Sequence, residues 1–222
     1  MINARPGQLG RPKDLEKRAA LLEAAGALFC AHGFDSVSLD AIAQSAGVSK
    51  LTIYSHFGDK DGLFSAAVEA RCQDQLPHGL FNVDEALPLE AALRRIGHAF
   101  VALVYSDDAV QLMRMIAGQA SASTRLARLY FAAGPKRALE DMERFLRGVA
   151  ERRTLAIDDP MLAASQFFAL LKGVGHMRCL LGLEAAPSAA ARSRHIDQCV
   201  QLFLKAYAPA SALAKAPAPA AP

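Results

Sequence analysis

One stretch, residues 38 to 60 (SLDAIAQSAGVSKLTIYSHFGDK), constrains the fold of this chain more than any other. Ser38 is a favourable N-cap, and the apolar residues that follow it recur on one side at helical spacing, which predicts a short helix. Gly47 can adopt the left-handed conformation that ends a helix. Ser49 then caps a second helix, which Gly58 ends. Two short helices joined by a glycine-containing turn are typical of a helix-turn-helix.

The second predicted helix has a polar outer face, because Ile53 and Phe57 face inward. Such a face can enter the major groove of DNA. There Lys50 can donate to guanine acceptors or to phosphate, and Thr52 can reach a base edge or a thymine methyl group. An ordinary helical corner with a solvated outer face would show the same pattern. The residues that we expect to contact DNA are on this face or at helix N-termini, where phosphates bind: Ser38, Ser49, Lys50, Leu51, Thr52, Tyr54, His56 and Lys60.

Residues 15 to 64 resemble the DNA-binding domain of the tetracycline-repressor (TetR) family of bacterial transcriptional regulators. The matched positions are Leu21-Leu22, Ala24-Ala25, Leu28-Phe29, Gly33-Phe34, Ser38 to Ala43, Ala46 to Ser49, Ile53 to Phe57 and Lys60 to Phe64. The resemblance implies that Tyr54 and His56 contact the DNA backbone. Leu51 departs from the family's pattern, in which a small residue is common at this position.

The rest of the chain has the composition and the periodicity of packed helices. Apolar residues make up 52% of the 222 residues, Trp is absent, and Ala and Leu are abundant. We therefore expect an all-α fold of about nine helices. N-cap residues, prolines or first-turn carboxylates predict helix starts near Pro88, Asp107, Asp159 and Ser188. The segment from 161 to 183 is apolar at nearly every turn, so we expect that helix to be buried on most of its circumference.

Composition shifts divide the chain into four parts. Residues 1 to 12 are basic and rich in Pro and Gly, and form either an arm for the DNA minor groove or a disordered terminus. Residues 13 to 59 form the helix-turn-helix domain. Residues 60 to 208 form a connector helix and a larger ligand-binding and dimerisation domain. Residues 209 to 222 are low in complexity, and we expect them to be disordered.

The C-terminal half, residues 106 to 207, resembles the C-terminal domain of the AefR-like branch of the same family. The markers are Met115 to Gln119, Leu129 to Pro135, Leu155 to Pro160 and Gln166 to Gly173. The resemblance implies a ligand cavity, and Met and aromatic side chains would suit an apolar effector that is neutral or weakly polar. An ordinary hydrophobic core is the alternative. The candidate cavity residues are His98, Phe100, Tyr105, Met113, Phe131, Phe167, Phe168 and His176.

The last two predicted helices carry more apolar surface than one bundle needs. We expect them to pair with their copies in a two-fold interface, which would match a palindromic DNA site. The residues that we assign to this interface recur at spacings of four, three and four: Ile196, Val200, Phe203 and Tyr207.

Enzyme motifs are absent from the sequence. It contains no H-E-x-x-H, no G-x-S-x-G and no phosphate-binding P-loop. Gly173-Val174-Gly175 begins like a dinucleotide-binding fingerprint, but Arg178 occupies the position of the third glycine. We therefore expect no catalytic residue, no cofactor and no metal. A cofactor-dependent helical enzyme and a helical ligand-binding protein without a regulatory role are the alternatives to a regulator.

Charge, cysteines and hydropathy add little that is specific. The net charge of +3 does not by itself indicate a nucleic-acid-binding protein. We expect Cys30, Cys72, Cys179 and Cys199 to be small buried hydrophobic residues in a reducing compartment, with a redox-sensing pair as the alternative. Without a signal peptide or about 20 consecutive apolar residues, we expect a cytoplasmic protein. Together, the patterns and the resemblance predict a dimeric, ligand-responsive repressor.

Overall fold

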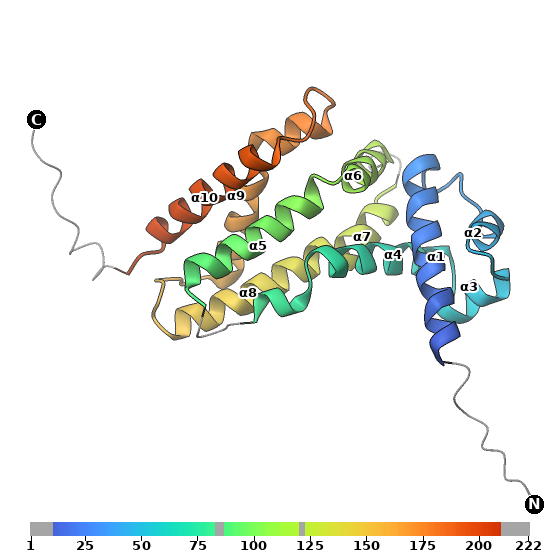
Figure 1. Cartoon of the computed structure of the whole chain (residues 1–222), viewed down its shortest axis with the longest axis horizontal. Helices are drawn as coiled ribbons and strands as arrows, with labels where there is room; N and C mark the ends of the chain where they lie inside the picture. Colours follow the sequence, from blue (N-terminus) through green and yellow to red (C-terminus); the bar gives the residue numbers. More distant parts are fainter. Residues whose placement is uncertain (1–10, 83–86, 120–122, 210–222) are drawn as a thin grey trace, which may run out of the picture. The chain divides into compact units, whose positions relative to one another are not determined.

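The computed structural model describes residues 11–82, 87–119 and 123–209. In these ranges the chain forms ten α-helices, one short 3-10 helix and no strand, so the predicted all-α fold is confirmed with one helix more than expected (Figure 1). Residues 1–10 of the predicted arm and 210–222 of the predicted tail lie outside the described residues, while the last two arm residues begin the first helix.

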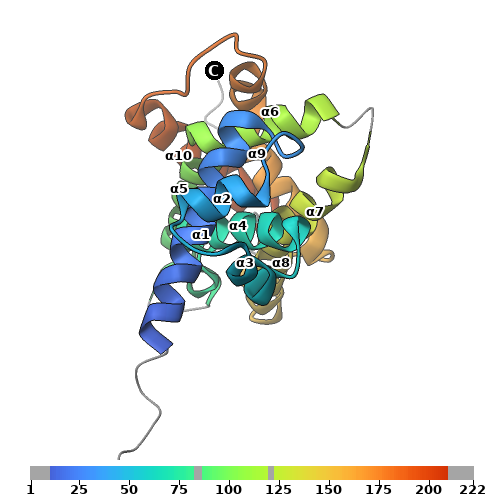
Figure 2. The same cartoon turned by 90° about the vertical axis from the view of Figure 1, so that its right-hand side faces the viewer.

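The helices divide into two compact units, and the first contains the helix-turn-helix. This unit comprises the chain up to Arg71 together with Gln111–Ala133, so it is larger than the predicted domain of residues 13 to 59. Its helices are α1 (Arg11–His32), α2 (Leu39–Ser45), α3 (Lys50–Phe57), most of α4 (Lys60–Gln75), the end of α6 (Asp107–Gln119) and α7 (Arg125–Ala133). Figure 2 shows α2 and α3 following α1 as the two arms of a corner.

Aromatic side chains form the core of the first unit. Phe29 of α1, Phe34 in the following turn and Phe64 of α4 have ring centroids 5.3 to 5.6 Å apart. Ile42 of α2 and Ile53 of α3 are fully buried in the same unit. Burial of each such side chain contributes about 1.5 to 3 kcal/mol, so these contacts hold both arms of the corner in place.

The second unit comprises Cys72–Val110 and the chain from Gly134 onward. Its elements are the 3-10 helix η1 (His78–Phe81), α5 (Leu89–Val104), α8 (Pro135–Glu151), α9 (Pro160–Leu180) and α10 (Ala189–Ala206), with the start of α6. α9 packs along α8, and α10 packs along α5 (Figure 1). The buried carboxylate of Asp141 on α8 pairs with His78 of η1 and with Arg144, which lies 2.9 Å away.

Several helix starts agree with the sequence. The Asp159 carboxylate accepts a hydrogen bond from the Leu162 N–H at 3.0 Å, and α9 begins at the following proline. The Ser188 hydroxyl accepts one from Ala191 N–H at 3.3 Å at the start of α10. These caps satisfy N–H groups that have no partner inside the helix, which is why Asp and Ser mark these positions.

The structure corrects the assignment of residues to the dimer interface. Ile196, Val200 and Phe203 expose at most 1% of their surface, because they pack in the core of their own chain. Tyr207 is half-buried and packs against the same core. An apolar stripe on one side of a helix can face only one way, and in α10 it faces the chain's own bundle. These side chains therefore cannot provide the main contacts with a partner.

The expectation for the helix after residue 160 is also wrong in part. α9 ends at Leu180, and its backbone is interrupted at Gly173, with φ 54° and ψ −172°. Several of its apolar side chains, and others in the turn after it, are exposed in the single chain: Met161, Leu162, Val174, Met177, Leu181 and Leu183. Among the residues that the structure describes, no helix combines the length and the hydropathy that crossing a membrane requires.

Candidate nucleic-acid interface

The corner between α2 and α3 is built by local hydrogen bonds. The Ser38 hydroxyl accepts from the Ala41 N–H at 3.1 Å and so caps α2. Gly47 has a φ of 65°, which brings the Val48 N–H to 3.0 Å from the Ala43 carbonyl. These interactions confirm the predicted corner. They turn the chain sharply, and α3 begins three residues after Gly47.

α3 is fixed by one buried side chain and presents the others outward. Ile53 is fully buried, whereas Leu51 is 75% exposed and Tyr54 is 47% exposed. Gly58 ends the helix with a φ of 77°, a conformation that favours glycine. The exposed face therefore combines one large apolar side chain with a phenol and the polar residues around them.

Polar side chains at the start of α3 are linked to one another and to α2. The Lys50 ammonium lies 2.8 Å from the Asp40 carboxylate of α2. This hydrogen bond, with the attraction between the charges, raises the pKa of Lys50. The Ser49 and Thr52 hydroxyls lie 2.9 Å apart, and the Ser49 hydroxyl also accepts from the Thr52 N–H at 3.3 Å. An ammonium has three donors, so Lys50 keeps protons for a further acceptor.

Two of the residues that we expect to contact phosphate already interact with other residues of the first unit. His56 Nε2 lies 3.0 Å from the Asp14 carboxylate of α1. The Lys60 ammonium donates to the Asp35 carbonyl at 3.3 Å and lies 4.6 Å from the centroid of the Phe34 ring. Partial burial lowers the pKa of Lys60. Contact with a phosphate would replace or extend these interactions.

The sequence did not predict the contacts that α6 and α7 make with the helix-turn-helix domain. Within the first unit, the end of α6 contacts the turn after α1, and α7 contacts the start of α4. The Phe34 N–H donates to the Met115 sulfur at 3.2 Å, and the Gln119 amide donates to the Asp35 carboxylate at 3.2 Å. Arg125 of α7 forms an ion pair with Asp61 at the start of α4. These partners are up to 84 residues apart, so no local pattern could have identified them.

The candidate cavity residues fall into three groups. Phe100, Phe167 and Phe168 pack in the core of the second unit, where the rings of Phe100 and Phe168 are stacked with centroids 4.3 Å apart. Tyr105 and His176 are also buried there, with ring centroids 5.2 Å apart. His98 is exposed on α5. Met113 and Phe131 belong to the first unit, where Met113 is half-buried and Phe131 is exposed.

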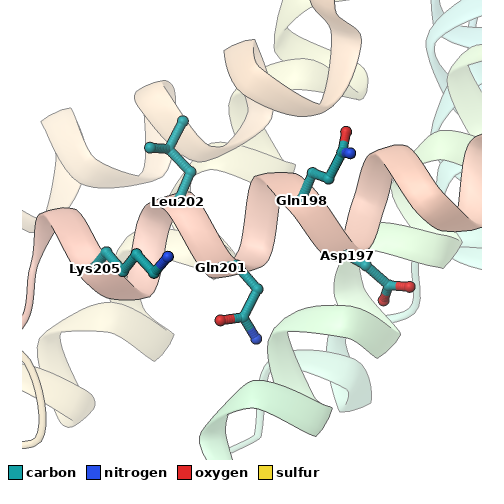
Figure 3. A pocket seen from close by; sticks show the side chains of 5 residues that line it. All are labelled: Asp197, Gln198, Gln201, Leu202 and Lys205. Carbon is teal, nitrogen blue, oxygen red and sulfur yellow. The ribbon is translucent and has the colours of Figure 1, made fainter. Parts of the chain in front are cut away.

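Two concavities in the described part of the chain are lined by other residues. The larger, of about 360 Å³, lies on the outer face of α10 (Figure 3). In this view Asp197 and Gln201 project on one side of the helix, and Gln198 and Leu202 on the other, with Lys205 at the far end. The smaller, of about 50 Å³, lies in the first unit beside Asp35 and Arg125. Neither concavity includes a candidate cavity residue.

The cysteines differ in burial. Cys179 and Cys199 are buried, and Cys30 and Cys72 are half-buried. The Cys199 thiol lies 3.4 Å from the Leu170 carbonyl. Burial raises the pKa of Cys199, which disfavours the reactive thiolate. This thiol therefore has the environment of a structural cysteine.

Two family models match the chain and together cover most of it. Residues 21–67 match the model of bacterial regulatory proteins of the tetR family. Residues 91–209, more than half of the chain, match the C-terminal domain of AefR-like transcriptional repressors.

Known proteins resemble the chain over most of its length or over about a third of it. A solved structure from Mesorhizobium loti, described as a TetR-family transcriptional regulator, is 28% identical, with a TM-score of 0.75, over 89% of this chain and 99% of its own. The flavonoid-responsive regulator FrrA is 33% identical, with a TM-score of 0.69, over 87% of this chain and 98% of its own. The Bacillus subtilis regulator YdeS is 40% identical over 31% of this chain and 34% of YdeS. The chain thus matches about a third of the length of its first curated relatives.

Proposed function

Because this chain belongs to the TetR family of bacterial transcriptional regulators, we propose that it is a dimeric repressor that binds a palindromic operator and is released by a small, largely apolar molecule. The observation that carries this proposal is the outer face of α3. That face is held in place by the buried Ile53 and is exposed at Leu51 and Tyr54. It has the size and the chemistry of a face that enters the major groove.

The roles in DNA binding follow from the chemistry of each side chain. Lys50 and Thr52 are suited to base edges, and Leu51 is suited to a thymine methyl group. Tyr54, His56 and Lys60 are suited to phosphates. Ser38 and Ser49 lie at helix N-termini, where N–H groups and the helix dipole favour an anion. The phosphate contacts would set the position of α3, and the α3 side chains would read the sequence.

The dimer would use the outer surface of the last two helices rather than their core-facing stripe. Val174 and Met177 on α9 and Leu202 on α10 are each more than half exposed. α9 and α10 pack against each other, so apolar side chains of both helices are available to a partner. A two-fold contact there would match the two half-sites of a palindrome.

The proposed effector site lies in the aromatic core of the second unit. Binding there would require Phe100, Phe167 and Phe168 to separate, because their rings are in contact in this structure. The relative FrrA is named for its response to flavonoids, which supports a response to aromatic compounds. Release from DNA then follows if the effector binds the non-operator conformation more tightly.

Selection from a random pool of double-stranded DNA tests the proposal directly. We expect the full-length protein to enrich an inverted repeat whose half-sites lie about one helical turn, roughly 34 to 36 Å, apart. The variant Leu51→Asp should lose this enrichment, because a carboxylate faces the negative groove, whereas Leu15→Asp, also at an exposed leucine of the first unit, should keep it. A wild-type protein that enriches no sequence would support the ligand-binding alternative without a regulatory role.

A further inference from the structure

The break in α9 is surrounded by side chains that donate hydrogen bonds. His195 Nε2 lies 3.2 and 3.1 Å from the carbonyls of Leu170 and Leu171. Both partners are acceptors, so His195 carries its proton on Nε2. The Tyr105 hydroxyl donates to the Lys172 carbonyl at 3.2 Å. These side chains satisfy carbonyls that directly precede the non-helical Gly173.

Two cations next to this break have no anionic partner. Lys172 of α9 and Arg192 of α10 are both half-buried, and no carboxylate in the described part of the chain pairs with either. Nearby arginines of the same unit differ: Arg178 lies 2.8 Å from the Glu184 carboxylate, and Arg94 pairs with two carboxylates. Unlike Arg94 and Arg178, Lys172 and Arg192 are therefore half-buried cations without a compensating carboxylate in the described part of the chain.

Two groups beside these cations, His176 and Tyr105, bring no negative charge. His176, four residues after Lys172 and beyond the break at Gly173, is buried and lies 3.1 Å from the Val104 carbonyl through Nε2. Burial lowers the pKa of His176, and the Lys172 charge lowers it further. Burial raises the pKa of Tyr105, and the charge of Arg192 acts in the opposite direction. Burial also lowers the pKa of Lys172. An unpaired ammonium that is partly withdrawn from water is unfavourable, and an arriving anion would relieve it.

The cluster adjoins the aromatic core. Phe168 lies one turn before Lys172 on α9, and its ring stacks on Phe100 of α5. Tyr105, the residue that ends α5 five positions after Phe100, donates from its hydroxyl to the Lys172 carbonyl at the α9 break. A molecule with an apolar body between the phenylalanines would therefore place a terminal group close to Tyr105 and Lys172.

We propose that Lys172 and Arg192, beside the Tyr105–His176 ring pair, bind the anionic group of the effector, which is therefore a weak organic acid with an apolar body. The inference rests on the proposed ligand response and adds a charge to the neutral or weakly polar effector expected from the sequence. Lys172 and Arg192 would supply the charge and the donors, because the Tyr105 hydroxyl and His176 Nε2 are already bonded to the Lys172 and Val104 carbonyls.

Three probes with one carbon skeleton test the charge preference: 4-phenylbutanoate, 4-phenylbutan-1-ol and 4-phenylbutan-1-amine. We expect calorimetry on the full-length protein at pH 7.5 to show that the acid binds about tenfold more tightly than the alcohol, which corresponds to one charge-assisted contact. Lys172→Met and Arg192→Met should each remove most of that preference, because the acid loses a charge-assisted contact that the alcohol does not make. Arg194→Met, at an exposed position of the same helix, is the matched control and should keep it.

The ligand-free protein provides a second measurement. Lys172→Met should raise the melting temperature by about 2 °C or more, because it removes an uncompensated charge, and Arg194→Met should not. An acid that binds no more tightly than the alcohol, or does not bind, would overturn the inference. If Lys172→Met were monomeric, the inference would also be overturned. That result would mean that Lys172 pairs with a carboxylate of a second copy in the dimer and not with an effector. Operator binding is measured separately without probes, so a protein that prefers the acid but binds no DNA contradicts only the proposed function.

Discussion

Single side chains in the first unit serve the fold and the proposed DNA contact at the same time. Lys60 is the clearest case, because its ammonium lies over the Phe34 ring and donates to the Asp35 carbonyl. These contacts hold the ammonium at the start of α4. A phosphate that approached α4 would meet a positive charge that is already placed and partly desolvated. Placement of this kind reduces the entropy lost on binding.

Replacement of Lys60 should change the salt dependence of operator binding. We expect Lys60→Met to weaken binding at physiological salt and to reduce the slope of log K against log salt by about one, because one phosphate contact is lost. Fluorescence anisotropy with labelled operator at several salt concentrations measures both quantities. Lys136→Met makes the same change of charge on α8, where Lys136 pairs with Glu140, and should leave the slope unchanged. An unchanged slope in Lys60→Met would exclude the phosphate contact.

Helices α6 and α7 show how an element outside the helix-turn-helix can hold it. α6 begins in the second unit at Asp107 and ends in the first unit at Gln119, and α4 also crosses between the units. Only the end of α6 supplies the sulfur that accepts the Phe34 N–H and the amide that binds Asp35. A displacement of α6 would therefore act directly on the turn between α1 and α2.

The Met115 contact can be removed with little change of volume. We expect Met115→Leu to lower the free energy of unfolding by about 1 to 3 kcal/mol, because the half-buried Phe34 N–H loses its acceptor. Operator affinity should fall as well, since the turn before α2 is no longer held. Met113→Leu is the matched control, as Met113 is also half-buried and lies two residues earlier on α6. Urea unfolding and DNA binding of both variants give the comparison, and equal behaviour would contradict the proposed role of the sulfur.

The interruption of α9 is a second feature at this scale. Gly173 has a φ of 54° and a ψ of −172°, a combination that costs other residues about 1 to 3 kcal/mol. We expect Gly173→Ala to lower the melting temperature, because alanine would favour a continuous helix and separate the carbonyls from Tyr105 and His195. Gly26→Ala, inside α1 with open space around the new methyl group, should instead be neutral or stabilising. A more stable Gly173→Ala variant would show that the interruption is not required.

The exposed apolar side chains of α9 and α10 concern the whole molecule. Val174, Met177 and Leu181 are each more than half exposed in the single chain, and so is Leu202 of α10. Apolar patches that are left open on a monomer commonly mark an interface. The proposed dimer would bury them and would bring two copies of the DNA-binding unit together.

Charges on this surface should separate the copies without disturbing the core. We expect the double variant Val174→Glu/Met177→Glu to be a folded monomer that has lost operator affinity, because a single half-site contact is weak. Analytical ultracentrifugation and circular dichroism measure assembly and fold. Leu15→Glu, an equally exposed position in the first unit, should remain a dimer. A double variant that still dimerises would place the interface on another surface.

The local elements were determined by the sequence alone. The caps at Ser38, Asp159 and Ser188 and the stop at Gly58 appear where their side chains or their backbone freedom predicted them. Each of these caps and stops depends on residues within about one helical turn, so the local sequence is sufficient to predict it. The all-α class followed from the same periodicity. The family followed from many such positions taken together.

Tertiary structure decided which way each apolar stripe faces. The stripe of Val200 and Phe203 could have served a partner or the chain's own core, and only the packing of α10 on α5 and α9 assigned it to the core. The contacts of Met115 with Phe34 and of Tyr105 with Lys172 join residues 81 and 67 positions apart. The periodicity of apolar residues predicts that a side chain is buried, but it does not predict which residues that side chain contacts. These contacts could therefore be identified only in the folded structure.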